Sequence, residues 1–521
     1  MPTINLVKPN RYQDSVTLMQ VALKLRELAG IDDASLMMGT EPNKEMLEEA
    51  RLLEAEGRAA GPNDLIIALT GDAASLKGIE AQVEAMMKAD TGSGSERAQK
   101  APHTLSAGIE ALPGVNLALI STPGLYAATE ARKALLAGMH VMVFSDNVSV
   151  DDEQKLKALA SERGLLLMGP DCGTAIIGGV PLGFANVVRR GKIGVVGASG
   201  TGMQQVTSMI DRYGAGISHA IGTGSRDMSA QIGGAMTLVG LRALANDAST
   251  SVIVIVSKPP HPDIAARVLQ EAAICGKPTV VCFLGMDTYS LVRGIENGQV
   301  TSASTLEEAA RLAVELAGGN APREGMDTLA VANIRKGLAQ GQRYIRGLFS
   351  GGTFCYEAML LIRRDLGPVF SNVPLTPDTA LADVHKSRGH TCLDLGSDEF
   401  TVGRPHPMID MSARQERILQ EARDPEVALL LLDIVLGYGA HGDPAGALAP
   451  TLVEAKRIAE ADGRQLSVVA SICGTERDPQ GFAIQERTLQ EAGVLLAPSN
   501  AAAARLAAAI ADDGRRRADP M

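Results

Sequence analysis

The 521-residue chain has little aromatic side-chain surface: it contains no tryptophan, and aromatic residues make up only 3% of it. Proteins that hold single-stranded nucleic acid stack the bases on aromatic rings, and duplex binders present a basic surface to the phosphates. The formal net charge here is −11. The composition therefore argues against a nucleic acid partner, although a local basic pocket could still bind a small anion.

The sequence also lacks long apolar runs and a secretory signal. No uninterrupted apolar run reaches the roughly 18 residues of a membrane-spanning helix. The first residues, MPTINLVKPNRYQDSV, do not combine a basic start with an apolar core. We expect no membrane span and a cytoplasmic location.

Paired cysteines and common metal motifs are missing as well. Scattered cysteines without paired spacing predict reduced thiols, and neither a disulfide framework nor a zinc site. His385 and His390 lie five positions apart beside Asp383, a spacing that fits no standard metal motif, so no metal site is predicted. The six cysteines are Cys172, Cys275, Cys282, Cys355, Cys392 and Cys473.

Two nucleotide-binding fingerprints are absent. No Gly-x-x-x-x-Gly-Lys-Ser/Thr loop occurs, which argues against a P-loop nucleotide site. The spacing of Gly197, Gly200 and Gly202 also differs from the dinucleotide fingerprint. A nicotinamide-dependent oxidoreductase is therefore weakly supported.

The chain does contain apolar, strand-like runs that alternate with helical patterns, and this alternation is typical of parallel α/β sheets. We predict an α/β fold of three three-layer domains of the Rossmann or flavodoxin type. A surface loop is expected over about 88–104 and a linker over about 317–342. The expected strands lie near residues 36–38, 65–69, 115–120, 140–144, 165–168, 193–196, 217–221, 252–256, 278–284, 346–350, 391–395, 427–433, 466–472 and 493–496.

The most informative stretch is the glycine-rich bend at 197–202, between a strand and a helix expected from Met203. Such a bend leaves backbone N–H groups unpaired at a helix start, where they can hold phosphate or carboxylate. Ser199 and Thr201 add hydroxyl donors, and Gly200 lets a ligand approach the backbone. The alternative is a tight turn with no ligand.

Other strand ends supply further candidates, because ligands of open parallel sheets bind beyond the carboxyl ends of the strands. Arg226 and Lys258 each follow a strand, and beside the 197–202 bend they would form an anion site with two cations. Alternatively, both are solvated or paired with Asp227 and nearby acids. The substrate-binding candidates at these and other strand ends are Asn147, Asp171, Gly224, Gly439 and Arg477.

The third domain contributes candidates for cation or proton-transfer roles in its loops. Arg404 and His441 are the residues that we expect to take part. A histidine in a loop is more often a hydrogen-bonded structural residue, so that alternative stays open.

Six runs of the sequence are distinctive. They are NRYQDSVTL at 10–18, GLLLMGPDCG at 164–173, KIGVVGASGTG at 192–202, SKPP at 257–260, TVGRPHPMID at 401–410 and GTERDP at 474–479. Together they resemble the FdrA family, over essentially the whole chain. FdrA proteins are in turn similar to succinyl-CoA synthetase. This resemblance implies a CoA-binding-like Rossmann domain over 1–190, a ligase-like domain over 191–320, and a second ligase-like domain over 340–512, which is similar to the C-terminal domain of the β subunit.

The sequence departs from succinyl-CoA synthetase where that enzyme carries its phosphohistidine. The corresponding stretch, 285–296, reads GMDTYSLVRGIE and has no histidine, and the supporting glutamate is missing from 256–260. Phosphate cannot be relayed covalently without the imidazole nucleophile. The glycine-rich CoA loop is not recognisable near 7–11, and no ATP-grasp region is present. A self-sufficient ATP-dependent ligase is therefore not expected.

The resemblance to FdrA implies a link to oxamate carbamoyltransferase and to purine and allantoin breakdown, together with companion subunits. That reaction joins carbamoyl phosphate and oxamate, or runs in reverse from oxalurate and phosphate. We expect the 197–202 bend to hold phosphate, Arg226 and Lys258 to neutralise it, and Arg404 and His441 to position the second substrate.

Two other functions remain possible at this point. The chain could be a subunit of an ADP-forming acyl-CoA synthetase that binds CoA, with the nucleotide site on another chain. It could also be a non-catalytic scaffold or regulatory subunit that retained the fold. In each case we expect small anionic ligands and a homo- or hetero-oligomer.

Overall fold

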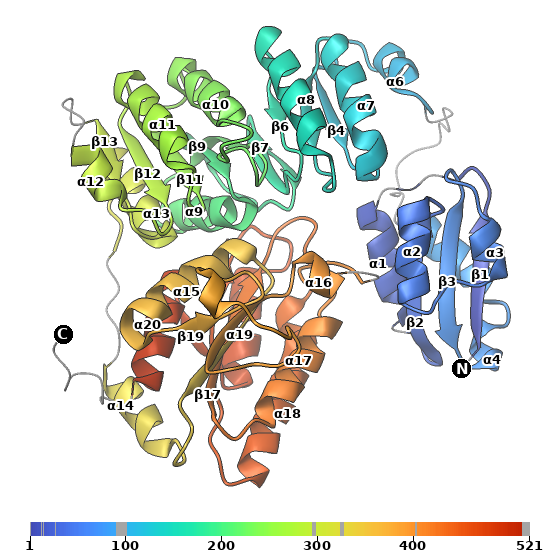
Figure 1. Cartoon of the computed structure of the whole chain (residues 1–521), viewed down its shortest axis with the longest axis vertical. Coiled ribbons are helices and arrows are strands. Elements are labelled where there is room, and N and C mark those ends of the chain that lie inside the picture. Colours follow the sequence, from blue (N-terminus) through green and yellow to red (C-terminus); the bar gives the residue numbers. More distant parts are fainter. Residues whose placement is uncertain are drawn as a thin grey trace. The chain divides into compact units, whose positions relative to one another are not determined.

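The computed structural model describes residues 2–11, 13, 15–26, 28–89, 102–293, 299–322, 328–401 and 404–512. The chain divides into two compact units. The first comprises Met1–Val115 and Ser397–Asp410, and the second comprises Asn116–Gly396 and Met411–Met521. Figure 1 shows both units, each of which is described by itself below.

The first unit is a small antiparallel sheet with helices on both faces. Its strands follow the order β1-β3-β2, and β3 runs antiparallel to both neighbours. Leu65, Ile67 and Leu69 of β3 pack with side chains of α1 and α5, whereas Ile66 and Ala68 pack with Leu47 and Leu52 on the other face. The elements are β1 (Thr3–Lys8), α1 (Ser15–Arg26), β2 (Ile31–Met38), α2 (Glu41–Glu49), α3 (Ala55–Ala59), β3 (Leu65–Gly71), α4 (Ala73–Leu76), α5 (Ile79–Ala89) and α6 (Leu105–Ala111).

The remote segment 397–410 belongs to this first unit. It contains the short helix α16 (Asp398–Thr401). Arg26 at the end of α1 forms an ion pair with the buried Asp410 and donates to the Ala34 carbonyl at 3.1 Å. This contact ties the segment to the N-terminal sheet.

This arrangement corrects the expectation of one Rossmann-type sheet over 1–190. The runs at 36–38 and 65–69 do form strands, but they pair antiparallel. β1, which the sequence pattern did not reveal, pairs with β3 from Thr3↔Thr70 to Lys8↔Leu65. Because β3 is buried on both faces, it reads as a continuous apolar run, which is the pattern of a parallel-sheet strand.

The second unit begins with a small parallel sheet, in the order β4-β5-β6. Its helices α7 and α8 pack against each other. The elements are β4 (Leu117–Ile120), α7 (Gly124–Leu136), β5 (His140–Val143), α8 (Val150–Glu162) and β6 (Leu167–Met168).

A seven-stranded sheet follows, in the order β13-β12-β11-β9-β10-β7-β8. Strands β13, β12, β11, β9 and β10 are parallel. At one edge, β7 runs antiparallel to β10, and β8 runs antiparallel to β7. Helices α9 and α13 lie on one face and α10 and α11 on the other (Figure 1). The elements are β7 (Thr174–Ile177), β8 (Val180–Gly183), β9 (Arg190–Ala198), α9 (Gly200–Arg212), β10 (Ile217–Gly222), α10 (Ala235–Asn246), β11 (Val252–Ser257), α11 (Pro262–Ile274), β12 (Thr279–Phe283), α12 (Thr288–Arg293), β13 (Val300–Ser302) and α13 (Leu306–Leu316).

The third sheet of this unit is six-stranded and parallel, in the order β15-β16-β14-β17-β18-β19. Helices α15 and α20 pack together, as do α17 and α18. The elements are α14 (Thr328–Gly337), β14 (Tyr344–Phe349), α15 (Gly352–Leu366), β15 (Val369–Phe370), a 3₁₀ turn (Pro377–Thr379), β16 (His390–Asp394), α17 (Ser412–Ala422), β17 (Val427–Val435), α18 (Pro444–Ala461), β18 (Ser467–Cys473), α19 (Phe482–Glu491), β19 (Leu495–Ala497) and α20 (Asn500–Ala511).

The predicted α/β fold with parallel sheets is confirmed, with one local difference. The segment expected as an irregular linker, 317–342, contains helix α14. Most of the loop expected over 88–104 lies outside the described residues. Within the described part of the chain, no helix is both long and apolar enough to cross a membrane.

A buried charge cluster joins α8 to the loop after β10. Lys157 of α8 is 1% exposed, and its Nζ lies 2.8 Å from Asp227 Oδ1 and 2.7 Å from Glu153 Oε1. Asp227 also accepts from the backbone N–H of Thr237 at 2.8 Å, at the start of α10. The cluster thus fixes three elements around the loop that carries Gly224 and Arg226.

Replacing Lys157 by Met should strongly destabilise the packing of α8 against the loop after β10. The change leaves buried carboxylates without their shared cation, and breaking a buried ion pair typically costs about 3–5 kcal/mol. Hydrogen exchange of the α8 and β10 amides should report the loss. Lys155→Met on the same helix is the control, because the Lys155 side chain is 69% exposed. Equal effects of the two changes would contradict this account of the cluster.

Candidate functional site

The glycine-rich bend after β9 forms the N-terminus of helix α9. Ser199 is the capping residue, and its Oγ accepts a hydrogen bond from the Gly202 N–H at 3.1 Å. The helix begins at Gly200, three residues earlier than the sequence pattern predicted, because this cap closes the first turn. Gly197 passes so close to β11 that a Cβ there would lie 2.6 Å from the Val256 carbonyl oxygen.

A second helix N-terminus faces the first one. After β14 the chain runs through Ser350 and Gly351 into α15. Ser199 Oγ and Thr353 Oγ1 share a hydrogen bond of 2.7 Å, and both residues are buried. A Cβ on Gly351 would lie 2.9 Å from Thr201 Cγ2. Figure 1 shows α9 and α15 adjacent where the two larger sheets of this unit meet.

Two facing helix N-termini make a strong anion site in principle. Each helix start carries partial positive charge and unpaired N–H groups. Anions bind such ends readily. Here the two dipoles are brought together by residues 154 positions apart in the chain.

Asp433 at the end of β17 shapes the start of α15. Its carboxylate accepts from the Ser350 N–H at 2.9 Å and from the Gly351 N–H at 2.8 Å. Arg414 Nη2 donates to the same carboxylate at 2.6 Å, and both side chains are 1% exposed. The N–H groups of Ser350 and Gly351, before α15, are therefore occupied by protein.

Lys258 and Asp394 converge beside Gly352, the first residue of α15. A Cβ on Gly352 would lie 2.3 Å from Asp394 Oδ2 and 3.3 Å from Lys258 Nζ. Lys258 follows β11 and is exposed, and Asp394 ends β16. Glycine is therefore required here to admit an acceptor and a cation to the helix start.

Asp171 lies within electrostatic reach of this cation. Desolvation raises the pKa of its carboxyl, whereas the Ser225 hydroxyl, Lys258 and Arg226 act to lower it. Gly224 has a left-handed φ of +88°, and a Cβ there would lie 2.2 Å from the Pro170 carbonyl oxygen. The structure thus brings the 169–171 turn and the loop after β10 together.

Arg226 is engaged in the protein, as the alternative interpretation of the sequence allowed. Its Nε donates to Glu153 Oε2 at 2.9 Å, and its Nη2 donates to the Val148 carbonyl at 2.7 Å. The partner acid is thus Glu153 of α8, whereas Asp227 binds Lys157. Asn147, exposed with φ +53°, immediately precedes Val148.

The candidates from the third domain are not gathered at the start of α15. His441 Nδ1 accepts from the Asp443 N–H at 3.0 Å, where Asp443 caps α18. Gly439 packs against the Phe184 ring, and the exposed Arg477 lies in the turn after β18. Arg404 belongs to the first unit and is left out of the site.

The sequence contained a signal for the second helix start that we did not use. The run Phe349-Ser-Gly-Gly-Thr-Phe354 places glycines directly after a strand, as the run at 197–202 does. Asp394 carried no comparable signal, because a single aspartate at a strand end is common in α/β sheets.

Three family models match parts of the chain. A CoA-ligase model covers residues 348–510, and a CoA-binding domain model covers 188–285. A model described as "AllF, heavy metal-associated domain" covers 1–103. The resemblance to FdrA predicts a CoA-binding-like domain at 1–190, whereas the CoA-binding model matches the segment that contains α9.

These descriptions imply two bound groups, CoA and a heavy metal, and the residues present fit only CoA. The free N–H groups at the start of α9 suit a phosphate of CoA as well as free phosphate. A heavy metal does not fit the first unit, because no cysteine precedes Cys172. Among the described residues, no group of three or more His, Cys, Asp or Glu is placed to hold a metal ion.

Two partial matches involve enzymes that form CoA thioesters. The chain is 29% identical to the α subunit 2 of an ADP-forming succinate–CoA ligase from Archaeoglobus fulgidus, over 33% of this chain and 59% of that one. The solved structure of an apo acetyl-coenzyme A synthetase 1 from Ca. Korarchaeum cryptofilum aligns at 17% identity, covering 78% of this chain and 84% of that one, with a TM-score of 0.30.

A third relative matches almost from end to end. The chain is 45% identical to the uncharacterized protein YahF of Escherichia coli, over 95% of this chain and 96% of YahF. The match spans the AllF-type, CoA-binding and CoA-ligase segments alike. This chain belongs to the YahF family, and it contains CoA-binding and CoA-ligase domains like those of succinyl-CoA synthetase.

Proposed function

We propose that the chain is a subunit of a phosphate-dependent group-transfer enzyme, which holds the phosphate of an acyl phosphate between α9 and α15. The observation that carries this proposal is the Ser199–Thr353 hydrogen bond of 2.7 Å, which sets two helix N-termini face to face. Lys258 supplies the cation beside this point. Arg226 holds the loop after β10 through Glu153 and does not contact the phosphate.

A direct reaction of the acyl phosphate suits the residues present. No histidine occurs between His261 and His385, so the stretch in which the related ligases carry a phosphohistidine has none. Without that nucleophile, phosphate cannot be relayed through a phosphohistidine in this stretch. An acyl phosphate that is attacked directly needs only charge stabilisation on the phosphate side.

We propose carbamoyl phosphate as this acyl phosphate. Its carbamoyl group carries N–H donors, and the Asp394 carboxylate lies beside the proposed phosphate position as an acceptor. The resemblance to FdrA, which is linked to oxamate carbamoyltransferase, and the match to an AllF-type domain support an allantoin-related role. Oxamate is then the second substrate, and companion subunits complete the enzyme in a hetero-oligomer.

In the proposed step, the oxamate nitrogen attacks the carbamoyl carbon. A C–N bond forms, the C–O bond to phosphate breaks, and its electron pair leaves on the phosphate. The proton lost by the nitrogen passes to the departing phosphate. The helix N-termini and Lys258 stabilise the negative charge that develops on the phosphate oxygens.

The second candidate is a subunit of an acyl-CoA ligase, which the CoA-binding and CoA-ligase matches favour. CoA would supply a thiol as the attacking group, and the α9 N-terminus would hold one of its phosphates. A nucleotide site and a phosphohistidine would then have to come from another chain.

The two candidates make different products from defined substrates. With companion subunits present, oxalurate and inorganic phosphate should yield oxamate and carbamoyl phosphate, which can be followed by ³¹P NMR. A parallel reaction contains CoA, ATP and succinate. Formation of an acyl-CoA without any phosphate-dependent cleavage of oxalurate would reject the carbamoyl transfer.

Gly352→Ala should weaken phosphate binding while the protein stays folded. The added Cβ would lie 2.3 Å from Asp394 Oδ2 and would displace it and Lys258 from the helix start. We expect the affinity for inorganic phosphate, measured by calorimetry, to fall by about tenfold or more. Gly108→Ala in α6 is the control, because a Cβ there meets nothing closer than 4.0 Å. Unchanged affinity in Gly352→Ala would place the phosphate elsewhere.

Lys258→Gln should lower turnover more than it lowers binding. Removing one charge-stabilising donor typically costs about 10²–10³-fold in turnover. The control is Lys192→Gln. Lys192 is also exposed, but it lies near the amino end of β9, whereas Lys258 follows the carboxyl end of β11. If Lys258→Gln leaves the activity of the assembled complex unchanged, the chain acts as a scaffold.

A further inference from the structure

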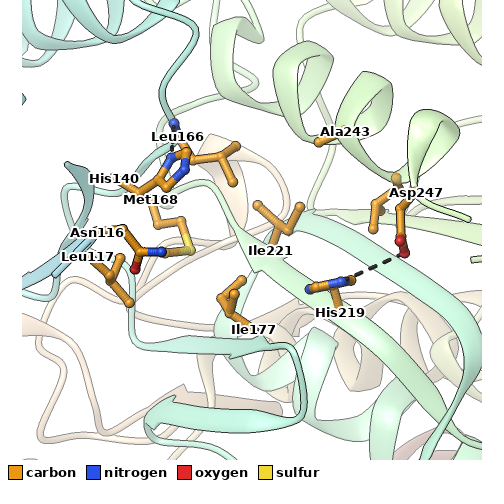
Figure 2. A pocket seen from close by; sticks show the side chains of 11 residues that line it. Asn116, Leu117, His140, Leu166, Met168, Ile177, His219, Ile221, Ala243 and Asp247 are labelled. Carbon is orange, nitrogen blue, oxygen red and sulfur yellow. Dashed lines mark hydrogen bonds and ion pairs between the residues drawn. The ribbon is translucent and has the colours of Figure 1, made fainter. Parts of the chain in front are cut away.

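A cavity of about 370 Å³ lies in the second unit, away from the proposed phosphate site. Asn116, Leu117 and His140 line it from the starts of β4 and β5, and His219 lines it from the beginning of β10 (Figure 2). The phosphate site instead follows the carboxyl ends of β9 and β11. The cavity therefore opens at the amino ends of the strands, at the opposite edge.

The wall of the cavity is mainly apolar. Its volume falls within the range of small-molecule sites, which are usually apolar with a few polar groups that fix orientation. The apolar lining residues are Leu117, Leu166, Met168, Ile177, Ile221, Ala243 and Leu244.

Both histidines carry their proton on Nε2. His140 Nδ1 accepts from the Leu166 N–H at 3.0 Å, and His219 Nδ1 accepts from the Gly178 N–H at 3.0 Å. A ring nitrogen that accepts a hydrogen bond carries no proton, so in each neutral ring the proton is on Nε2. Burial lowers the pKa of His219. His219 Nε2 lies 3.7 Å from Asp247 Oδ2, which leaves the Nε2–H of His140 as the histidine donor for a ligand.

The charges around the cavity disfavour an ionic ligand. None of its lining residues is Lys or Arg. Its charged member, Asp247, has a pKa held at about 2, chiefly by hydrogen bonds from the Ser249 and Thr250 hydroxyls. Its Oδ2 lies 3.7 Å from His219 Nε2. Arg190, which also acts on His219, donates to the Ser218 carbonyl at 2.6 Å. An anion would meet the Asp247 charge, and a cation would lose its hydration in the mainly apolar cavity.

We propose that this cavity binds a small uncharged molecule with an apolar body and a carbonyl or amide acceptor. The acceptor receives a hydrogen bond from the Nε2–H group of His140, and His219 lines the same cavity. The Asn116 side chain, also at the rim in Figure 2, can satisfy an amide on the ligand. The site is separate from the chemistry at α9 and α15, and its test does not depend on the proposed reaction.

Three probes of similar size and different charge test this assignment: benzamide, benzoate and benzylamine. The protein is labelled at histidine Cε1, and its eight histidines are followed by NMR. His140→Gln and His219→Gln assign the two signals. Benzamide should shift both signals with saturation near about 1 mM, as the binding energy per atom of a small fragment allows. Benzoate and benzylamine should bind at least about tenfold more weakly.

A pair of substitutions locates the binding. Ala243→Phe projects a ring into the cavity from an exposed position on α10 and should abolish the benzamide shifts. Ala248→Phe, at an exposed position just beyond α10 and outside the lining, should leave them unchanged. Absence of a saturable shift at His219, equal binding of benzoate, or full binding to Ala243→Phe would each overturn the proposal.

Discussion

The contact between the N-termini of α9 and α15 is the constraint on which the rest of the site depends. Each helix start alone would be an ordinary strand-to-helix turn. Their approach requires small residues on both sides, since Gly351 lies against Thr201 and leaves no space for a Cβ. The Ser199–Thr353 hydrogen bond then fixes the register between the two larger sheets of the second unit. Two partial positive charges are held close together by this packing, which favours an anion as the natural third partner.

The sequence predicted the elements around α9 well because their signals are local. The strand and the glycine-rich bend depend on neighbouring residues, and they appear in the structure with shifted ends. The role of Ser199 as the helix cap was not predicted, because we expected its hydroxyl to donate to a ligand. The antiparallel N-terminal sheet was not predicted. β1 is only partly buried along most of its length, and β3 is buried on both faces, so neither shows the alternation of a half-exposed antiparallel strand.

The candidate site was only half predictable for a related reason. A glycine-rich helix start can be read from the sequence, but the identity of the second helix that meets it depends on tertiary packing. Lys258 was predicted because it follows a strand that borders β9, and it does lie beside Gly352. Arg226 follows the other neighbour of β9, yet its side chain turns to Glu153 of α8. The local sequence around Arg226 does not indicate this pairing, because Glu153 lies 73 residues earlier in the chain.

The distribution of charge explains how the site stays positive in an acidic protein. Asp433 would oppose an anion at α15, but Arg414 neutralises it within the core, and both side chains are withdrawn from solvent. Glu153 and Arg226 form another ion pair beside the loop after β10. Lys258, the helix N–H groups and the Asp394 carboxylate lie at the start of α15. Backbone N–H groups do not titrate, so most of the positive potential is independent of pH. It is also fixed in place by packing before any ligand arrives, as charge stabilisation in a transition state requires.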